Sequence, residues 1–295
     1  MRMQKEIRRA AIIRRPHQNC RSLSESVEKA LAARGVDTLA VDADLTESGS
    51  YAYPAADIKD IDLAFSLGGD GTLLAAARLL YGFSIPVFAV NMGTFGFLTT
   101  ISHDEILREI DALFLGQAAF EERLMLTALV RRAGQSIGEY RALNEIAVTR
   151  RGMSGLILLD AWVNGEFLCG YRADGLLVAT PTGSTGYSLS ASGPILLPTL
   201  ENMIITPICP HSVASRPFVV GGNDVVTLRV GEGRARSFLF VDAQEGAALL
   251  DGDEIEVRRA PHSLTLVRSS RRSSLEVLRT KFAWNGMSGL SAPLP

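Results

Sequence analysis

The sequence predicts two domains, an α/β domain with a Rossmann-like parallel sheet followed by an all-β domain of the β-sandwich type. In the first part of the chain, short apolar stretches alternate with stretches rich in helix formers, which is typical of a parallel sheet with crossover helices. From about residue 116 onward, short strand-like runs follow one another with few helical periods, which indicates an all-β fold. A length of 295 residues also favours two domains. We therefore expect residues 1–115 to form the α/β domain and residues 116–274 the β-sandwich.

The elements of the first domain follow from the spacing of apolar residues and from helix start and stop signals. We expect strands over residues 7–13, 38–41, 61–67 and 85–90. We expect helices over residues 22–34, 73–80 and 104–115. Ser22 or Ser24 can cap the first helix, Gly35 can end it, and Ser102 is the expected N-cap of the third. Residues 46–59 are polar and mixed, which is typical of a loop or a short irregular segment.

The second domain shows strand-like runs separated by turn signals. They cover residues 125–132, 141–150, 156–163, 166–171, 176–179, 225–230, 237–241, 254–258 and 263–268. Asn164-Gly165 lies between two of these runs and is the strongest hairpin signal in the chain. Residues 274–284 are consistent with a closing helix or a closing strand.

Composition excludes several classes of protein. Hydrophobic residues make up 47% and charged residues 21%, and a formal net charge of -2 gives no bulk case for nucleic acid or an anionic membrane as a partner. Cys20, Cys169 and Cys209 are far apart and odd in number, which is typical of free thiols in a reducing compartment. The four histidines show no metal-ligand spacing. No apolar run approaches the length of a transmembrane helix or of a signal peptide, so we expect a cytoplasmic protein.

A glycine-rich turn stands between the expected strand at 61–67 and the expected helix at 73–80. It consists of Gly68, Gly69, Asp70, Gly71 and Thr72. A strand, a glycine turn and a helix in this order present backbone N–H groups to a phosphate in α/β proteins. The turn matches neither the P-loop pattern GxxxxGK[ST] nor the dinucleotide pattern GxGxxG.

Asp70 is the unusual residue of this turn, because a carboxylate at the centre of a phosphate loop repels its ligand. It could take a proton from an attacking hydroxyl, or it could help to hold a metal ion. The alternative is that Asp70-Gly71 is only a turn dipeptide. The strand-to-helix context and the neighbouring glycines favour a functional site.

A second candidate site involves two adjacent polar residues, Asn144 and Glu145, within an apolar strand-like run. Neighbouring residues of a strand point to opposite faces, so one of the two faces the core unless the pair lies at a strand end or in a cleft. Burying either side chain without partners is costly. The sequence alone fits a binding site and a solvent-exposed strand end equally well.

A segment rich in hydroxyl groups follows the expected strand at 176–179, over residues 180–192. It offers hydroxyls and backbone N–H groups to the oxygens of a polar ligand, and Tyr187 could stack on a base. A structural loop, or a helix capped by Ser184, is the alternative. Arg172 and Asp174 precede the segment and could pair with each other or with a ligand. GxSxG is absent from the segment, which disfavours a nucleophile elbow.

Several segments together resemble the NAD kinase family. They read LGGDGT at 67–72, NMGTFGFLT at 91–99, NE at 144–145, DGLLVATPTGSTGYSLSASGPI at 174–195, ITPICPHSVASRP at 205–217 and DAQ at 242–244. The GGDG turn alone also occurs in phosphofructokinases and diacylglycerol kinases, whereas the NE pair together with TPTGST is specific. The resemblance runs in the same order from about Ile61 to the C-terminus, and before Ile61 it is one of pattern only.

This resemblance implies ATP-dependent transfer of phosphate to the adenosine 2′-hydroxyl of NAD, which gives NADP. It implies an α/β domain, a β-sandwich that binds NAD, and a final segment, residues 275–295, that returns to the first domain. It also implies a divalent metal ion, Mg²⁺ being typical, with no ligands assigned, and a homodimer or homotetramer.

The resemblance also implies roles for individual residues. Asp70 would be the catalytic base, and Gly71, Asn144 and Glu145 would contact NAD. The rest of the nucleotide site would be lined by Arg172, Asp174, Thr182, Thr185, Gly186, Tyr187, Ser188, Leu189, Ser190 and Gln244. The phosphate loop would consist of Gly68, Gly69, Gly71 and Thr72. Gly186 stands where the family often has alanine, and the variable pair Thr94-Phe95 receives no role.

Two other classes of function are consistent with parts of the sequence. One is a lipid or sugar kinase that shares the GGDG turn, and the other is a nucleotide-binding regulator without catalysis. The hydroxyl-rich segment favours a polar nucleotide over a lipid. A regulator would not need a carboxylate inside its phosphate loop.

Overall fold

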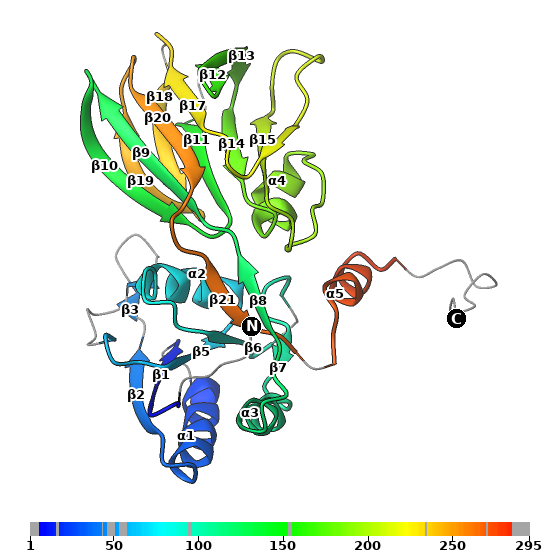
Figure 1. The fold of residues 1–295 in the computed structure, drawn as a ribbon. Helices are drawn as coiled ribbons and strands as arrows, with labels where there is room; N and C mark the ends of the chain where they lie inside the picture. The colour runs from blue at the N-terminus through cyan, green and yellow to red at the C-terminus, as the bar shows by residue number, and fades with distance from the viewer. Residues whose placement is uncertain are drawn as a thin grey trace, which may run out of the picture. The chain divides into compact units, whose positions relative to one another are not determined.

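The protein divides into two compact units, each with its own sheets (Figure 1). The computed structural model describes residues 6–15, 18–42, 44–45, 51–52, 58–93, 96–152, 155–233, 235–269 and 271–284. The first unit consists of Met1–Ala76, Ile85–Glu121 and Thr265–Pro295. The second consists of Ala77–Ser84 and Glu122–Leu264. An α/β unit and an all-β unit confirm the predicted fold class.

The first unit is built on a seven-stranded sheet with the strand order β2-β1-β5-β6-β21-β8 and with β7 beside β6. These strands are β1 (Arg9–Arg14), β2 (Asp37–Asp42), β5 (Leu63–Gly68), β6 (Val87–Asn91), β7 (Ile101–Ser102), β8 (Phe120–Arg123) and β21 (Leu264–Val267). The pairings β2–β1, β1–β5, β5–β6, β6–β7 and β6–β21 are all parallel. Every residue of β5 and β6 is buried, as expected for parallel strands covered on both faces. A separate two-stranded sheet pairs β3 (Asp44–Leu45) with β4 (Tyr51–Ala52).

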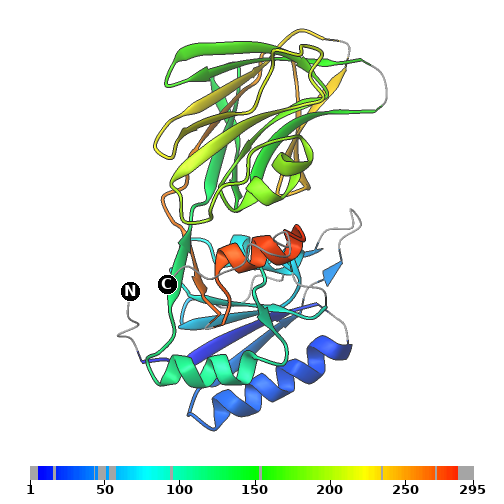
Figure 2. The same cartoon turned by 90° about the vertical axis from the view of Figure 1, so that its right-hand side faces the viewer.

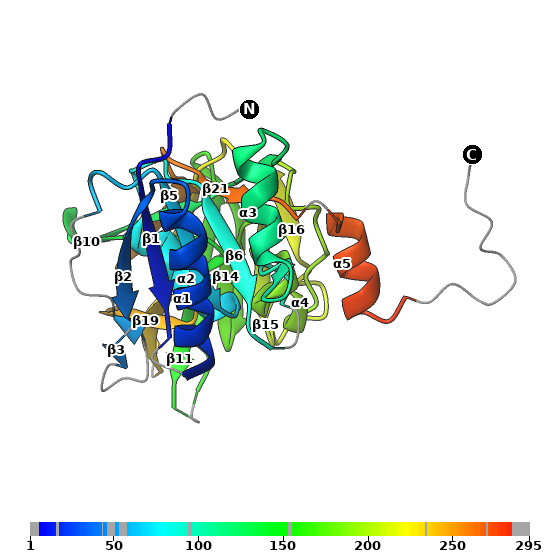
Figure 3. The same cartoon turned by 90° about the horizontal axis from the view of Figure 1, so that it is seen from below.

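Helices α1 (Gln18–Ala32) and α3 (Ile106–Phe114) lie side by side on one face of this sheet (Figures 2 and 3). Their apolar residues join those of β1, β5 and β6 in one core, which includes Ile12, Leu31, Phe65, Phe88 and Ile110. Helix α2 (Asp70–Leu79) begins directly after β5, and α5 (Ser274–Lys281) belongs to the same unit over the described residues. Ser273 caps α5, because its hydroxyl accepts the backbone N–H of Glu276 at 3.1 Å. The closing segment is therefore a helix.

Two of the predicted helix caps are wrong. Helix α1 begins at Gln18, so Ser22 and Ser24 lie inside it, and the buried Ser24 hydroxyl donates to the Glu28 carboxylate at 2.7 Å instead. Helix α3 begins at Ile106 with Glu105 at its N-cap. Ser102 lies in β7, where its backbone N–H donates to the Glu105 carboxylate at 3.2 Å. The Glu105 side chain accepts no N–H of the first turn of α3, so neither residue caps the helix with its side chain.

The second unit is a sandwich of two six-stranded antiparallel sheets. One has the order β10 (Gln135–Ala142), β9 (Leu126–Arg132), β20 (Glu254–Arg259), β17 (Val226–Val230), β12 (Ile157–Val163) and β13 (Glu166–Ala173). The other has the order β16 (Phe218–Gly221), β15 (Asn202–Ile208), β14 (Gly175–Ala179), β11 (Glu145–Arg151), β18 (Arg236–Val241) and β19 (Gln244–Leu249). Buried apolar residues from both sheets form one core, among them Leu126, Val148, Leu176 and Ile255.

The Asn164-Gly165 hairpin is confirmed. The two residues connect β12 with β13, and both have positive φ angles, 52° and 82°. This geometry matches the right-handed twist of the flanking strands, which is why asparagine followed by glycine signals such a turn.

The division between the units differs from the expected boundaries. The strand expected at residues 263–268 falls within the predicted sandwich, but β21 pairs with β6 of the parallel sheet, with Leu266 opposite Val87. Residues 116–121 likewise belong to the first unit, and residues 77–84 to the second. A short apolar strand looks the same in either sheet, so its partner could not be predicted from its own residues.

None of the helices in the described ranges combines the length and the apolar character that crossing a bilayer requires.

Candidate functional site

The glycine-rich turn lies at the carboxyl end of β5, where open α/β sheets bind their ligands. Gly68 ends the strand, and a Cβ at this position would lie 2.1 Å from the Thr72 hydroxyl oxygen. Only glycine therefore lets the first turn of α2 fold back this closely. Gly69 has no heavy atom within 4 Å of the place where its Cβ would be, so packing against the described residues does not require a glycine at this position.

The Asp70 carboxylate accepts four hydrogen bonds from residues 97–99, which follow β6 in the same unit. Its Oδ2 accepts the backbone N–H of Phe97 at 3.0 Å. Its Oδ1 accepts the N–H of Leu98 at 3.3 Å and both the N–H and the hydroxyl of Thr99, at 3.1 and 3.0 Å. A Cβ on Gly96 would lie 1.8 Å from Oδ1. Asp70 is thus held in one orientation where two turns meet, an arrangement that a turn dipeptide does not require.

Arg15 lies beside the phosphate loop, and the sequence reasoning missed it. Its Nε donates to the Thr72 hydroxyl at 3.0 Å, and its Nη2 would lie 3.2 Å from a Cβ on Gly71. Arg15 follows β1, which pairs in parallel with β5, so the ends of the two strands lie next to each other. The arginine could be found only once this strand order was known.

In the second unit, Asn144 and Glu145 lie where the chain crosses from β10 to β11, and their backbone groups are all paired. Asp242 accepts the N–H groups of Leu143, Asn144 and Glu145, at 3.0, 2.7 and 3.2 Å. Thr180 pairs with two of the carbonyls, since its hydroxyl donates to Leu143 at 2.6 Å and its N–H to Asn144 at 2.8 Å. The third carbonyl, of Glu145, accepts the N–H of Asp242 at 3.0 Å.

The side chains of the same two residues are not satisfied in this way. Asn144 Oδ1 and Glu145 Oε2 are buried, and no described group donates a hydrogen bond to either. Glu145 is only 4% exposed. Burial, together with the nearby charge of Asp242, raises the pKa of Glu145 to about 8. Buried polar atoms without partners are rare in proteins and costly, which points to a ligand that supplies the missing hydrogen bonds.

The hydroxyl-rich segment packs directly against this pair. It forms a 3₁₀ turn over Gly183–Thr185 and a short helix, α4 (Tyr187–Ser190). A Cβ on Gly183 would lie 2.1 Å from the Asn144 carbonyl oxygen, so glycine is required for the close approach. A Cβ on Gly186 would lie 3.3 Å from the Gly183 carbonyl oxygen and 3.4 Å from Glu145 Oε2, so the alanine that the family often has there would require a small shift of this turn.

The other predicted residues of this segment have different environments. Tyr187 is 42% exposed, whereas the Ser188 hydroxyl is buried against that of Thr206 at 2.9 Å. Thr182 is buried, and its hydroxyl accepts a hydrogen bond from Arg123 at 3.5 Å. The Thr185 hydroxyl donates to the Thr182 carbonyl at 3.3 Å. Leu189 is half-buried and Ser190 is exposed, both on α4.

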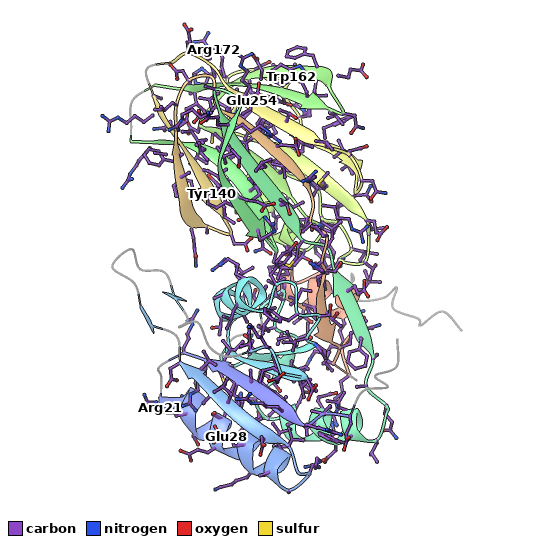
Figure 4. All side chains as sticks on the ribbon, turned by 60° about the vertical axis from the view of Figure 1, so that its left-hand side comes forward. Arg21, Glu28, Tyr140, Trp162, Arg172 and Glu254 are labelled. Carbon is purple, nitrogen blue, oxygen red and sulfur yellow. The ribbon has the colours of Figure 1, made fainter. Side chains whose placement is uncertain are left out.

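Arg172, Asp174 and Gln244 lie on or beside other strands of the same unit. Asp174 forms a bidentate ion pair with Arg150, at 2.6 and 3.3 Å, so of the two alternatives left open by the sequence the Arg172–Asp174 pair is not the one that forms. Arg172 is exposed on β13, an edge strand of its sheet (Figure 4). Gln244 begins β19, directly after the turn that carries Asp242. Burial raises the pKa of Tyr187, and Cys209, Asp174 and Glu145 add to this rise.

The two units therefore offer different chemistry. The first carries a glycine loop at a helix N-terminus, a fixed carboxylate and a neighbouring arginine, which suit the phosphates of a nucleotide. The second carries a buried amide and a buried carboxyl group beside an exposed aromatic ring, which suit the hydroxyls and base of a nucleoside. Within the described ranges, no three His, Cys, Asp or Glu side chains stand close enough together to bind a metal ion.

Comparison with known proteins agrees with this division. The family model of the ATP-NAD kinase N-terminal domain matches residues 11–118, and that of the C-terminal domain matches residues 143–269. A protein named NAD kinase from Geobacter sp. (strain M21) is 42% identical over 272 residues, which cover 89% of this chain and 93% of the relative.

Two solved structures are also similar. Yeast NADH kinase complexed with NADH has a TM-score of 0.83 and 26% identity, over 98% of this chain and 91% of the yeast chain. An NAD kinase from Archaeoglobus fulgidus in complex with ATP has a TM-score of 0.72 and 26% identity, over 93% of this chain and 97% of that chain. Together with the two domain matches and the 42% identity to the Geobacter protein, they show that this chain belongs to the NAD kinase family.

Proposed function

We propose that this protein is an NAD kinase, which transfers the terminal phosphate of ATP to the adenosine 2′-hydroxyl of NAD and so makes NADP. The observation that carries the proposal is the pair of buried, unpartnered atoms Asn144 Oδ1 and Glu145 Oε2 in a chain of this family. A ribose presents neighbouring hydroxyls that can donate to such acceptors. The similar solved structures contain NADH in one case and ATP in the other, which supports both classes of substrate.

Asp70 is the catalytic base in this proposal. Its carboxylate accepts the proton of the attacking 2′-hydroxyl, which makes the oxygen a better nucleophile towards the phosphate. The four hydrogen bonds from residues 97–99 support the role, because they fix the orientation of the carboxylate before substrate binds. Positioning and charge neutralisation supply most of the catalysis of phosphoryl transfer, so a fixed base suits this reaction.

The donor phosphates bind at the loop formed by residues 68–72. Backbone N–H groups at the start of α2 point towards such a ligand, and the helix dipole favours negative charge there. Arg15 adds a positive charge beside Thr72, in a loop that has no P-loop lysine. The phosphate loop and the base thus share one turn of the chain.

A divalent metal ion, such as Mg²⁺, is part of the proposal. Asp70 is the carboxylate of the phosphate loop, and no cluster of metal-binding side chains occurs in the described ranges. This donor set fits a Mg²⁺ ion held largely by substrate phosphates and water, as is usual in kinases. Such an ion would neutralise charge on the phosphates.

We also propose that the protein forms a homodimer or a homotetramer. Both sheets of the second unit end in edge strands, and β16 exposes Phe218 and Val219, at 49% and 41%. Exposed apolar edges are usually covered, and a second copy of the chain can cover them. Light scattering at micromolar concentration is expected to give at least twice the chain mass of 31.8 kDa. A single species of that mass would argue against an oligomer.

The test of the proposed function is incubation of the purified protein with Mg-ATP and one acceptor at a time. NAD, NADH, a diacylglycerol and a hexose are the acceptors to compare, since the GGDG turn alone would fit several kinases. We expect NADP or NADPH from the dinucleotides and no phosphorylation of the lipid or the sugar. Phosphorylation of the lipid or the sugar alone would overturn the proposal.

A further inference from the structure

The carboxylate of Asp242 organises the chain at the crossing from one sheet of the sandwich to the other. Leu143 and Asn144 lie between the end of β10 and the start of β11, so neither sheet supplies partners for their N–H groups. Asp242 accepts both of these N–H groups and that of Glu145, all within 3.2 Å. A buried backbone N–H without an acceptor would cost free energy, so one side chain satisfies three donors that the fold leaves over.

Asp242 is itself held firmly in place. It lies in the turn between β18 and β19 with a φ angle of 49°, and its side chain is 0% exposed. Its own N–H donates to the Glu145 carbonyl, which makes the connection between the two segments reciprocal. Arg78 lies 3.5 Å from its Oδ2 and provides a positive charge. Three N–H dipoles and one guanidinium group thus surround a fully buried carboxylate.

We propose that Asp242 is a positioning residue for the dinucleotide: it fixes the backbone of residues 143–145 so that Asn144 Oδ1 and Glu145 Oε2 are held ready for the ligand. The inference rests on the proposed function, because NAD is the ligand considered. Asp242 does not touch the ligand in this account and acts through the two residues it holds. A preformed pair of acceptors lowers the conformational entropy cost of binding, and in this account Asp242 strengthens NAD binding by lowering that cost.

The test compares Asp242→Asn with Asp253→Asn. Asp253 is a matched control, because it is also buried in the second unit, accepts the backbone N–H of Leu250 at 2.8 Å and pairs with Arg132 at 2.7 Å. Asparagine keeps the shape of the carboxylate but replaces one acceptor oxygen with an NH₂ donor. In Asp242→Asn this donor faces a backbone N–H of residues 143–145, which is also a donor. We expect Asp242→Asn to weaken NAD binding by about tenfold to hundredfold in calorimetry, and Asp253→Asn to leave it unchanged.

Two further readouts separate positioning from loss of fold. Partial unfolding lowers kcat without changing a KM, so the inference requires a raised KM for NAD with a nearly unchanged KM for ATP. Asn144→Ala combined with Asp242→Asn is expected to lose less affinity than the sum of the two single variants, because both act on the same contact. Full additivity, or NAD binding by Asp242→Asn at wild-type affinity, would overturn the inference.

A measurement on the wild-type protein covers the case in which Asp242→Asn does not fold. The amide protons of residues 143–145 are expected to exchange as slowly as those in the middle of β11, and NAD is expected to change their rates little. Fast exchange that becomes slow only when NAD is added would contradict a preformed arrangement. Failure of the wild-type protein to bind NAD would instead contradict the proposed function and would leave the backbone arrangement testable by exchange.

Discussion

The backbone N–H of Glu145 donates to the Asp242 carboxylate at 3.2 Å, and the backbone N–H of Asp242 donates to the Glu145 carbonyl at 3.0 Å, so that two buried carboxyl groups lie close together. The Asp242 carboxylate receives three backbone N–H donors, whereas Glu145 Oε2 receives none. Burial and the nearby charge of Asp242 raise the pKa of Glu145 to about 8. Burial also raises the pKa of Asp242, and the three N–H groups and Arg78 oppose that rise. At neutral pH the protonated carboxyl group of Glu145 still has a carbonyl oxygen that can accept a hydrogen bond from a ligand hydroxyl.

In the variant Glu145→Gln, the free energy of unfolding is expected to fall less with rising pH than it does in the wild type. An ordinary glutamate loses its proton near pH 4.3 in the unfolded chain, whereas Glu145 keeps it up to about pH 8 when folded. Between these values the folded state binds the extra proton, so the free energy of unfolding falls as pH rises and levels off above pH 8. Glutamine stays neutral and avoids this cost, about 1.4 kcal/mol per unit of pKa difference.

Urea unfolding at pH 5, 6.5 and 8 measures this effect. The variant should gain stability relative to the wild type at each step towards pH 8. If the free energies of unfolding of the two proteins changed with pH in parallel, the folded-state pKa of Glu145 would be that of an ordinary glutamate.

Asn144→Ala is expected to weaken NAD binding while sparing the stability of the protein without ligand. Asn144 Oδ1 is buried without a hydrogen bond in the described structure, so removing it should leave the free energy of unfolding unchanged or raise it. Binding should lose about 1–3 kcal/mol, because the ligand then lacks a partner. Calorimetry for NAD and thermal unfolding without NAD are measured on the same preparation. A variant that is less stable but binds NAD normally would refute the assignment.

Tyr187→Ala is expected to weaken NAD binding, whereas Tyr187→Phe is expected to keep it. The ring is 42% exposed beside the hydroxyl-rich segment and is available to pack on a base. Phenylalanine preserves the ring and removes only the hydroxyl, so it isolates the contribution of stacking. Equal losses in both variants would show that the hydroxyl, and not the ring, contacts the ligand.

Gly183→Ala and Gly69→Ala are expected to separate folding from phosphate binding. A Cβ at 183 would lie 2.1 Å from the backbone carbonyl oxygen of Asn144, so alanine should cost about 1–3 kcal/mol of stability or more. A Cβ at 69 meets nothing within 4 Å, so this variant should unfold at the wild-type temperature. It should nevertheless raise the KM for ATP, because the phosphates approach that backbone closely. A normal KM for ATP would remove Gly69 from the phosphate loop.

The sequence predicted the elements whose signals are local. The Asn164-Gly165 hairpin and the glycine turn after β5 depend on a few neighbouring residues and were placed correctly. Features that depend on strand order were missed. Arg15 lies beside Thr72 only because β1 pairs with β5, and β21 joins the parallel sheet although its own pattern fits either domain.

The partners of charged side chains also could not be predicted from the sequence. Asp174 pairs with Arg150 from a neighbouring segment, although Arg172 stands closer in the chain. In the strand β13, Arg172 is directed by the alternation of the sheet, so closeness in sequence says little about contact. The same holds for Asp242, whose three N–H partners lie almost a hundred residues earlier, at 143–145.

Asp70→Asn tests the central claim that this chain is a kinase with Asp70 as its base. Thr99→Val is the matched control, because it removes one of the hydrogen bonds to Asp70 but keeps the carboxylate. If Asp70 served only to hold the turn at residues 96–99, the two variants should show similar defects. Steady-state formation of NADP is measured for both variants and for the wild type across a magnesium titration, with NAD affinity followed in parallel.

The account predicts that the wild type phosphorylates the 2′-hydroxyl of NAD and that Asp70→Asn lowers kcat by about 100- to 10,000-fold at every magnesium concentration. NAD affinity should change little, and Thr99→Val should lose only a few-fold in kcat. Recovery of Asp70→Asn at high magnesium would assign Asp70 to the metal instead of the proton. A kcat near that of the wild type would contradict both roles, and a wild-type protein that makes no NADP would contradict the proposed function itself.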